Sequence, residues 1–553
     1  MKTSKGMRIC WWMAAVSLGC GFMGCSTATQ DAAWQEKRRA ALNRPREVIY
    51  NNDGNEPVLW PAHEPFSIDT FLKMRTSPVA GSQVDTVFYC PISSGFGFLT
   101  ANIPAADLKL RPVGGVAHLA AYTNVLQQFI DRGTDPVREV GLWCKTNNIE
   151  FFVSLRVNDT HDSGADQTRL GPPYDLSNWA FSPFKAQHPE MLMGSYTNRP
   201  PHCTWSAVDF THEEVRERFF RICRDLCTHY DLDGLDLDFF RHLQLFRSVA
   251  WGGTASDAER DLLTAVMRRI RAAAEQEGKR RGRPILISIR VPDSVPYCRD
   301  VGIDLEAWLG EGLVDMVAGT GYWQFNPWPY MVELCRRHRV KFYASLDESR
   351  LPENADTPKR LSRNSVATYR GQAMAARQAG ADGVMYFNIF NPAKVKSLMW
   401  GNPARMRLHD KCYHVTYRGN HKHARRYCKT ADRYFSMAEL SVNTPSKIAP
   451  GKSCSFPVWI GDNLPERMKE NRPPVCELVI DATVPEGAVL TVSVNGQTAV
   501  AGKVEKNARS YALKPELLAC GKNLLTFTVG GVTNANPVVV RDAAILITDF
   551  KNK

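Results

Sequence analysis

Apolar runs with the two-residue period of a β-strand alternate with segments of helical period between residues 84 and 388. Strand side chains point alternately to opposite faces, whereas an amphipathic helix repeats its apolar positions every three to four residues. Eight runs have the length and composition of buried strands. They are Val84–Tyr89, Glu150–Arg156, Thr204–Phe210, Gly234–Phe240, Pro284–Val291, Leu313–Ala318, Val340–Ser345 and Gly383–Asn388.

The segments between these runs carry helix start and stop signals. Thr211 and Glu214 have the spacing of a capping box before an apolar stripe, and Ser256 and Glu259 repeat it. Gly278 suits the end of the second helix. Eight βα units in about 320 residues predict a TIM barrel, an α/β fold, because the alternation requires parallel strands and right-handed crossovers. We assign it to residues 47–428 and expect its site at the carboxyl ends of the strands.

Residues 429–553 change to short alternating strands separated by turns. Asn495-Gly496 and Gly530-Gly531 are turn signals between such runs. This pattern predicts an all-β sandwich as a C-terminal accessory domain. Two roles stay open for it: binding a glycan, or packing against the barrel as a structural domain.

The first 25 residues have the pattern of an export signal. Three basic residues precede an apolar run, Cys10–Met23, that is short for a membrane span and is followed by small residues. Gly24-Cys25 resembles a bacterial lipobox, and we expect a lipid anchor on Cys25; Cys20 is a poorer candidate. A plain secretory signal is the alternative. Residues 26–46 are expected to form a tether, which would place the protein in the periplasm or at the cell surface.

Composition narrows the class of function. A chain of 553 residues with 44% hydrophobic content can fold into two or more domains. The net charge is +12, but Lys and Arg are dispersed, and no nucleic-acid-binding motif accompanies them. A nucleic-acid function is therefore not expected, while polyanionic glycans stay compatible with the charge. The twelve cysteines after Cys25 are scattered and predict neither a disulfide framework nor a zinc ribbon.

The segment DLDGLDLDFFR, residues 231–241, carries the strongest chemical signal. Asp236 and Asp238 lie on one face of a strand, and burying two carboxylates together is costly without a use or a partner. Glycosidic cleavage needs one carboxylic acid and one carboxylate. We expect Asp238 to be catalytic, with Asp236 one pleat deeper tuning it. The favoured partner is Asp293, with Asp347 and Glu348 as alternatives.

A structural explanation of these carboxylates also stays open, in which Arg156, Arg241 or Arg290 neutralises them. Further polar and aromatic residues at the strand ends are candidates for substrate binding. They are Arg156, Asn158, Asp159, Arg241, Tyr322, Trp323, Asp347, Glu348 and Asn388. The first three could instead cap a loop. Tyr322 and Trp323, with Phe325 and Trp328, could stack on pyranose rings or form a packed lid.

Several of these motifs resemble glycoside-hydrolase-like barrels of a family-10-like group found in exported bacterial proteins. The resemblance covers most of residues 47–405. It is carried by Asn51-Asn52-Asp53-Gly54, Gln83–Tyr89, Arg156–Asp159 with His161-Asp162, Asp233–Arg241, Arg290–Asp293 and Gly321-Tyr322. The resemblance implies carbohydrate processing. The chitinase-like barrels share a DGxDxDxE signature on the fourth strand, but Phe240 stands where they have the acid Glu, so their mechanism is not carried over.

No metal or cofactor is expected. Six histidines and cysteines near the end of the barrel match no standard zinc spacing. They are His409, Cys412, His414, His421, His423 and Cys428. Asp159, His161 and Asp162 could hold a cation, although hydrogen-bonded loop residues are the better explanation.

These inferences together predict an exported glycoside hydrolase that acts on a complex, possibly anionic, polysaccharide or oligosaccharide and is attached to a membrane by its lipid. A non-catalytic glycan-binding lipoprotein with a degenerate barrel is the alternative. A structural envelope protein is a third hypothesis, which predicts neither binding nor turnover.

Overall fold

The structure is a computed structural model. It describes residues 32–91, 99–105, 121–164, 181–353, 361–388, 401–419, 421–470, 473–531 and 536–549. The expected lipidation site, Cys25, lies outside these residues, as does the rest of the expected signal sequence. Among the described helices, none is both long enough and apolar enough to cross a membrane.

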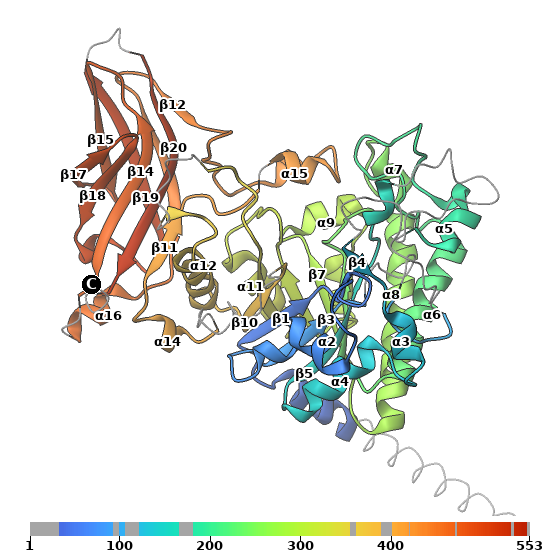
Figure 1. The fold of residues 1–553 in the computed structure, drawn as a ribbon. Helices are drawn as coiled ribbons and strands as arrows, with labels where there is room; N and C mark the ends of the chain where they lie inside the picture. Colours follow the sequence, from blue (N-terminus) through green and yellow to red (C-terminus); the bar gives the residue numbers. More distant parts are fainter. Residues whose placement is uncertain are drawn as a thin grey trace, which may run out of the picture.

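Eight parallel strands close into a barrel of the TIM type (Figure 1). Around the barrel they follow the order β1-β10-β9-β8-β7-β6-β5-β3. Their bounds are β1 Val48–Asn52, β3 Thr86–Tyr89, β5 Glu150–Arg156, β6 Gly234–Asp238, β7 Leu286–Val291, β8 Met316–Gly319, β9 Lys341–Leu346 and β10 Gly383–Tyr386. Nearly every residue of these strands is buried, because helices cover the outside and side chains fill the inside.

Seven of the eight expected strands are confirmed, and one is wrong. Residues 204–210 lie in an irregular segment in which only Val208 makes a bridge, to Leu192. Their apolar side chains are buried under a loop, which explains why the composition mimics a strand. The missing strand is β1, whose sequence VIYNN has only three apolar residues. Its two asparagines are buried all the same, and Asn52 donates from Nδ2 to Glu56 at 3.1 Å.

Helices connect the strands and surround the barrel. Their bounds in the first part of the chain are α2 Ile68–Arg75, α3 Leu126–Ile130, α4 Pro136–Thr146, α5 Pro183–Gln187, α6 Glu213–His229, α7 Arg247–Ala250 and α8 Asp257–Arg281. Those that follow are α9 Val295–Val301, α10 Leu305–Gly310, α11 Pro329–Arg337, α12 Val366–Gln378, α14 Pro403–Met406, α15 His421–Arg425 and α16 Leu464–Lys469. Short 3-10 turns are Ser77–Val79, His161–Gly164, Pro189–Met191, Ala431–Tyr434 and Pro515–Leu517. A two-stranded sheet pairs β2, Trp60–Pro61, with β4, Tyr122–Thr123.

The two expected capping boxes have different outcomes. The box at Ser256 and Glu259 opens α8, with both reciprocal hydrogen bonds present. The box expected at Thr211 and Glu214 is not formed, since α6 begins at Glu213 after His212 without a side-chain cap. The end of α8 also differs. The helix continues past Gly278 to Arg281, and Gly282, with φ +74°, takes the left-handed position that ends it.

The segment expected to be a tether packs on the barrel from residue 32 onward. Residues 32–42 are helical, and Trp34 is buried and donates from its indole N–H to Glu275 of α8. Arg46 is buried as well, and forms a two-point ion pair with Glu150 at the start of β5, with N···O distances of 2.5 and 2.8 Å. These contacts fix residues 32–46 to the end of the barrel opposite the expected site.

The C-terminal part contains two antiparallel sheets (Figure 1). The larger has the order β11-β20-β14-β18-β17, with β12 also paired to β20, and the smaller has the order β13-β19-β15-β16. Their bounds are β11 Lys411–His414, β12 Ser446–Ile448, β13 Ser453–Ile460, β14 Val475–Thr483, β15 Ala488–Val494, β16 Gln497–Thr498, β17 Val500–Glu505, β18 Ala508–Leu513, β19 Gly521–Gly531 and β20 Val538–Thr548. The larger sheet thus begins at β11, before the expected boundary at residue 429.

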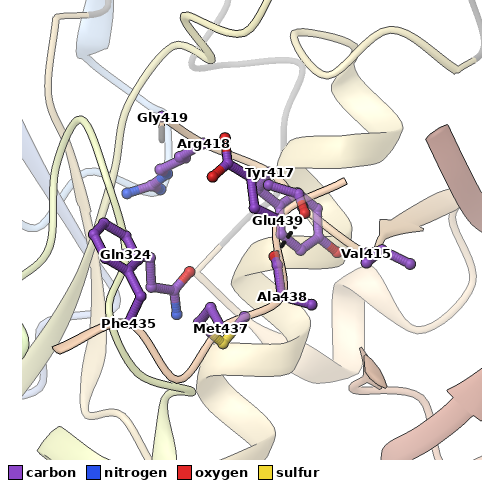
Figure 2. Close-up of a pocket in the computed structure, with 10 residues that line it drawn as sticks. Gln324, Val415, Tyr417, Arg418, Gly419, Phe435, Met437, Ala438 and Glu439 are labelled. Atoms are coloured by element: carbon purple, nitrogen blue, oxygen red, sulfur yellow. Dashed lines mark hydrogen bonds between the residues drawn. The ribbon is translucent and has the colours of Figure 1, made fainter. Parts of the chain in front are cut away.

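The chain then returns to the barrel between β11 and β12. Residues 415–419 and 435–439 lie side by side there and line a pocket of about 20 Å³ with Gln324, enough for one water molecule (Figure 2). Thr416, which also lines this pocket, donates from its hydroxyl to the carbonyl of Ala438. The returning segment therefore closes tightly on the loop that follows β8.

Helix α12 lies between the barrel and the larger sheet (Figure 1), and two glycines allow this close packing. A Cβ added at Gly371 of α12 would lie 2.3 Å from the carbonyl oxygen of Cys412 in β11. A Cβ at Gly461, just after β13, would lie 2.4 Å from the backbone of Met374. Because these contacts are to backbone, a larger residue would push the sheet away from the barrel.

Candidate active site

The strand register places two layers of polar residues inside the barrel. Ser154, Asp236 and Ser288 are paired across β5, β6 and β7, and form the deeper layer. Arg156, Asp238 and Arg290 are paired in the same way two residues nearer the carboxyl ends. The expectation that Asp236 and Asp238 share a face, with Asp236 one pleat deeper, is confirmed by this register.

Asp238 is a carboxylate held in an ion pair. Arg290 donates to it twice, from Nε to Oδ1 at 2.9 Å and from Nη2 to Oδ2 at 2.7 Å. The backbone N–H groups of Phe240 and Arg241 also donate to Oδ1, each at 3.0 Å. Both side chains of the pair are buried. Such a two-point, charge-assisted arrangement fixes the carboxylate firmly in place.

Asp236 lies in a different environment. It is fully buried, and the Ser154 hydroxyl donates to its Oδ2 at 2.7 Å. Its Oδ1 has no hydrogen-bond partner among the described residues. Burial, followed by the negative charge of Asp238, raises the pKa of Asp236 to about 7. Asp236 is therefore a group that holds a proton beside the Asp238–Arg290 pair near neutral pH.

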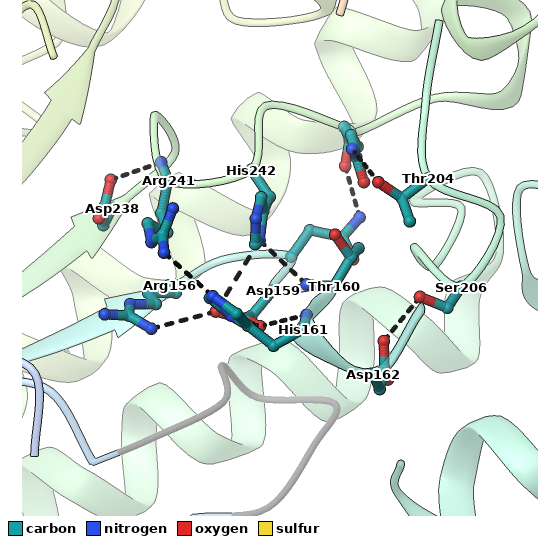
Figure 3. A network of polar contacts seen from close by, with 12 residues as sticks. Arg156, Asp159, Thr160, His161, Asp162, Thr204, Ser206, Asp238, Arg241 and His242 are labelled. Carbon is teal, nitrogen blue, oxygen red and sulfur yellow. Dashed lines mark hydrogen bonds and ion pairs between the residues drawn. The ribbon is translucent and has the colours of Figure 1, made fainter. Parts of the chain in front are cut away.

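Arg156 belongs to a network of polar contacts near Asp238 that also contains Asp159, His161 and His242 (Figure 3). Its guanidinium pairs with Asp53, just after β1, and with Asp159 at 3.4 Å. Asp159 in turn accepts from the backbone N–H of His161 at 2.9 Å and lies 2.7 Å from Nδ1 of that ring. Burial alone would raise the pKa of Asp159, but His161, His242 and Arg156 together lower it well below its usual value. Asp159 is thus a fixed anion that orients its neighbours.

The two histidines of this network have defined tautomers. Arg241 donates from Nη2 to Nε2 of His161 at 3.0 Å, so the His161 proton lies on Nδ1, facing Asp159. The backbone N–H of Thr160 donates to Nδ1 of His242 at 3.0 Å. Burial lowers the pKa of His242 well below its usual value, so this ring is neutral.

Asn158 holds loops together and is not free to bind a sugar. Its amide Nδ2 donates to the carbonyls of Val208 and Gln244, and its Oδ1 accepts from the backbone N–H of Val208 at 3.0 Å. All of its polar atoms are therefore engaged with backbone. Between sugar binding and loop capping, the structure favours loop capping for Asn158.

Asp293, the favoured partner of Asp238, is also engaged with backbone. Its two oxygens accept from the N–H groups of Phe325 at 3.0 Å and Asn326 at 2.8 Å. Burial raises the pKa of Asp293 to about 6. The carboxyl group ties the loop after β8 to the end of β7, so the structure gives it a structural role in place of the expected catalytic one.

Asp347, at the end of β9, has a free oxygen. Its Oδ1 accepts from the backbone N–H of Glu348 at 2.7 Å, while its buried Oδ2 has no hydrogen-bond partner among the described residues. Burial raises the pKa of Asp347 to about 6, although Arg418, Arg350 and Arg290 act to lower it. Glu348 is exposed, in keeping with a solvated loop carboxylate.

Tyr322 connects the β6 and β10 ends of the barrel. Arg241 donates from Nη1 to its hydroxyl, and Asn388 donates from Nδ2 at 3.4 Å. The guanidinium of Arg350 lies 3.7 Å from the centroid of the Tyr322 ring. Thus four of the expected substrate-binding residues, Arg241, Tyr322, Asp347 and Asn388, lie on one side of the mouth.

Trp323 is not a sugar-stacking platform in this structure. It is completely buried and packs on Phe240 and Tyr427, with ring centroids 4.4 and 5.7 Å away. Phe325 and Trp328 are buried too. These aromatics form the packed lid that was the alternative, because the returning segment after β11 covers them.

Several residues of the site do not follow from the sequence pattern. Arg418 comes from the returning segment and donates to Thr320 Oγ1 at 2.6 Å, the carbonyl of Ser345 at 2.7 Å and Gln372 Oε1 at 3.0 Å. Thr320 has φ +72°, a strained conformation for a β-branched residue, and it is held there by Arg418. No strand-end rule could find a residue that lies outside the βα pattern.

Metal binding can be tested against the ligand types present. Asp159, His161 and His242 offer ligand atoms within 4.8 Å of one another. However, Arg156 and Arg241 donate into the same cluster, and their charges oppose a cation. Asp162, the third residue of the cation site suggested by the sequence, pairs instead with Lys185 at 2.6 Å and accepts from Ser206. Hydrogen-bonded loop residues remain the better explanation.

Comparison with known proteins finds likeness to solved structures but no matching family. No family model and no curated protein matches the chain. Solved structures with partial likeness include a cycloisomaltooligosaccharide glucanotransferase from Paenibacillus sp., with TM-score 0.34 and 7% identity over 91% of this chain. A second is α-L-fucosidase isoenzyme 2 from Paenibacillus thiaminolyticus, with TM-score 0.38 and 10% identity over 66% of this chain. A third is a family 18 N-acetylglucosaminidase from Paenibacillus barengoltzii, with TM-score 0.34 and 12% identity over 65% of this chain.

The chain spans 57% of the length of the glucanotransferase and 50% of the fucosidase, but all of the N-acetylglucosaminidase. By their names these neighbours are a glucanotransferase, a fucosidase and an N-acetylglucosaminidase. At TM-scores below 0.4 the likeness carries no argument about chemistry, which rests on the side chains described above.

Proposed function

We propose that this protein is a glycoside hydrolase in which Asp347 is the acid and Asp238 the carboxylate. The observation that carries the proposal is the contrast between the two groups. Asp238 is held in a two-point ion pair by Arg290, whereas Asp347 has an oxygen without a hydrogen-bond partner among the described residues and a pKa raised to about 6. Two carboxyl groups with such different hydrogen-bond environments can divide acid and base work between them.

The charge of Arg290 acts on both carboxyl groups. Arg290 hydrogen-bonds Asp238, and its charge also acts on Asp347. A glycosidase acid must donate a proton to the leaving oxygen, and the other carboxylate must attack the anomeric carbon or activate water. Asp347 suits the first role because it holds its proton up to a pH of about 6. Asp238 suits the second because its two-point ion pair with Arg290 fixes its orientation.

Asp347 replaces Asp293 as the proposed partner for a geometric reason. Both have a pKa raised to about 6 by burial. However, the oxygens of Asp293 are used by two backbone N–H groups, whereas Asp347 keeps one free. We assign Asp236 a supporting role, since it lies one layer below Asp238 and its own raised pKa lets it hold a proton near neutral pH.

The test is reducing-end release from neutral, uronic and sulfated oligosaccharides by the protein from Ser26 onward. Asp238→Asn and Asp347→Asn should each reduce release by about 100-fold or more, the usual contribution of an acid or base. Glu348→Gln is the matched control, because Glu348 is the exposed neighbour of Asp347. Release that persists in Asp347→Asn but vanishes in Asp238→Asn would show that another carboxyl group, and not Asp347, is the acid.

A second candidate function is glycan binding without turnover, and one observation favours it. All four hydrogen bonds to Asp238 come from groups that also stabilise the barrel, as expected if the carboxylate is structural. In that case oligosaccharides would bind to the parent protein without release of reducing ends, and Asp347→Asn would leave the affinity unchanged.

We further propose export and a lipid anchor on Cys25, on the sequence pattern of residues 1–25 alone. Export would bring the protein to extracellular or periplasmic glycans. Palmitate labelling of cells that express the full chain tests this proposal, since label should enter the parent and be lost in Cys25→Ala. Equal labelling of the parent and of Cys25→Ala would show that the lipid is attached to another residue. No labelling of either protein would indicate a plain secretory signal.

A further inference from the structure

Three arginines from three separate elements lie near two tyrosines, Tyr322 and Tyr427. Arg241 follows β6, Arg350 follows β9 and Arg426 follows α15. The guanidinium groups of Arg350 and Arg241 lie 3.7 and 5.5 Å from the centroid of the Tyr322 ring.

Arg426 joins this group across a second tyrosine. Its guanidinium lies 5.9 Å from the centroid of the Tyr427 ring, and Tyr427 stacks on Trp323 directly above the barrel. The charges of Arg426, Arg241 and Arg350 all act on the hydroxyl of Tyr427. Arg241 and Arg350 therefore share the ring of Tyr322, and Arg426 lies at Tyr427, which packs against the neighbouring Trp323.

These arginines differ from Arg290 and Arg156 because none of them forms an ion pair with a carboxylate of the described residues. Arg290 pairs with Asp238, and Arg156 pairs with Asp53 and Asp159. Among the described residues, no Asp or Glu forms an ion pair with Arg241, Arg350 or Arg426.

The donors are also arranged for use. Arg241 is held by His161 and Tyr322, yet its Nε is buried without a hydrogen-bond partner among the described residues. A buried donor without a partner is costly, and a ligand that accepts from it recovers that cost. Arg350 and Arg426 are exposed, so their guanidinium groups are available to a ligand from solvent.

We propose that Arg241, Arg350 and Arg426 form a subsite for an anionic group of the substrate, so that the enzyme takes glycans bearing carboxylate or sulfate. This inference rests on the proposed function and names its substrate class. Guanidinium forks match planar carboxylate and tetrahedral sulfate oxygens, and charge-assisted hydrogen bonds of this kind are strong. A neutral sugar would leave three positive charges facing one another without compensation.

The experiment measures binding by calorimetry to Asp347→Asn, which removes turnover while keeping the arginines. The probes are three hexasaccharides: oligogalacturonate, chondroitin sulfate and cellohexaose. The variants Arg350→Gln and Arg426→Gln are added singly to this background, and Arg425→Gln is the matched control. Arg425 is the exposed neighbour of Arg426 and is already paired with Asp432.

We expect the charged probes to bind at least about 10-fold more tightly than cellohexaose, and each subsite variant to lose about 10-fold. The affinity of the charged probes should fall as NaCl rises from about 50 to about 300 mM, because salt screens the interaction. Comparison of the uronic and sulfated probes decides which anion is preferred. The Arg425→Gln control should bind as its background does.

Three results would overturn the subsite: equal affinity for neutral and charged probes, no loss in Arg350→Gln and Arg426→Gln, or no binding of any probe. The two proposals fail separately. If charged probes bind through the arginines but the parent never cleaves them, the proposed hydrolase activity is contradicted and the anionic subsite is supported. If the parent cleaves cellohexaose and Arg350→Gln leaves that rate unchanged, the hydrolase is supported and the subsite is contradicted.

Discussion

Two sides of the barrel mouth use charge in opposite ways. On the side of β5, β6 and β7, Arg156, Asp238 and Arg290 form a paired sector in which each charge has a partner at hydrogen-bond distance. On the side of β8, β9 and β10, Asp347, Arg350 and Tyr322 form an unpaired sector. There a carboxyl oxygen lacks a partner among the described residues, and a guanidinium lies on an aromatic ring. The comparison teaches that paired charges build the site, while unpaired groups are left to meet a ligand.

The largest expected effect comes from breaking the paired sector. Arg290→Met leaves Asp238 buried without its partner, which should lower the free energy of unfolding by about 3–5 kcal/mol. Urea denaturation measures this loss. The double variant Arg290→Met with Asp238→Leu should recover most of it, since no buried charge remains. A loss below about 1 kcal/mol in the single variant would show that the pair does not hold the barrel.

Asp236 tests the layer beneath that pair through pH. Its pKa is raised to about 7 in the folded protein, above the unfolded value of about 3.9, so it contributes stability that is complete below about pH 4 and lost as pH rises through 7. The loss is on the order of 4 kcal/mol at most. Asp236→Asn should flatten stability against pH between 4 and 7, as measured by thermal unfolding in a pH series. An unchanged profile would mean that Asp236 ionises normally.

Arg418 tests the unpaired sector from its structural side. Arg418→Met removes donors from Thr320, Ser345 and Gln372 and should cost about 2–3 kcal/mol in the free energy of unfolding. Its charge also lowers the pKa of Asp347, so the variant should raise that pKa. An acid is active when protonated, so activity should fall above about pH 6 in the parent and at higher pH in the variant. If activity falls at the same pH in the parent and in Arg418→Met, the charge of Arg418 does not set the pKa of the acid.

The smallest expected effect is at Glu348. Glu348→Gln should change the free energy of unfolding by less than about 0.5 kcal/mol, because Glu348 is exposed and forms no ion pair with a described residue. Release of reducing ends should stay within about twofold of the parent. A large loss of activity would mean that Glu348, and not Asp347, is the acid of this sector.

The sequence predicted the paired sector better than the unpaired one. Period-two alternation placed Asp236 and Asp238 on one face, and the register confirms this. Neutralisation by Arg290 was foreseen as an alternative, and the structure shows that ion pair. These residues lie on the strands themselves, where side-chain direction follows from the backbone.

The unpaired sector depends on contacts that no local pattern records. Arg418 and Arg426 reach the mouth only because the chain enters the larger sheet at β11 and then returns. Asp293 was expected to face substrate, but it meets the N–H groups of a loop whose path is set by tertiary packing. The strand β1 was missed because two of its five residues are polar, and Asp53, named only as part of a motif, was therefore not assigned to the site.

The most direct test of the account is the rate of reducing-end release by Asp347→Asn, measured beside Glu348→Gln on uronic and sulfated oligosaccharides. If Asp347 is the acid, we expect a loss of about 100-fold or more in Asp347→Asn and near-parent rates in Glu348→Gln. Near-parent release by Asp347→Asn would contradict it, because the unpaired carboxyl group would then have no part in the chemistry.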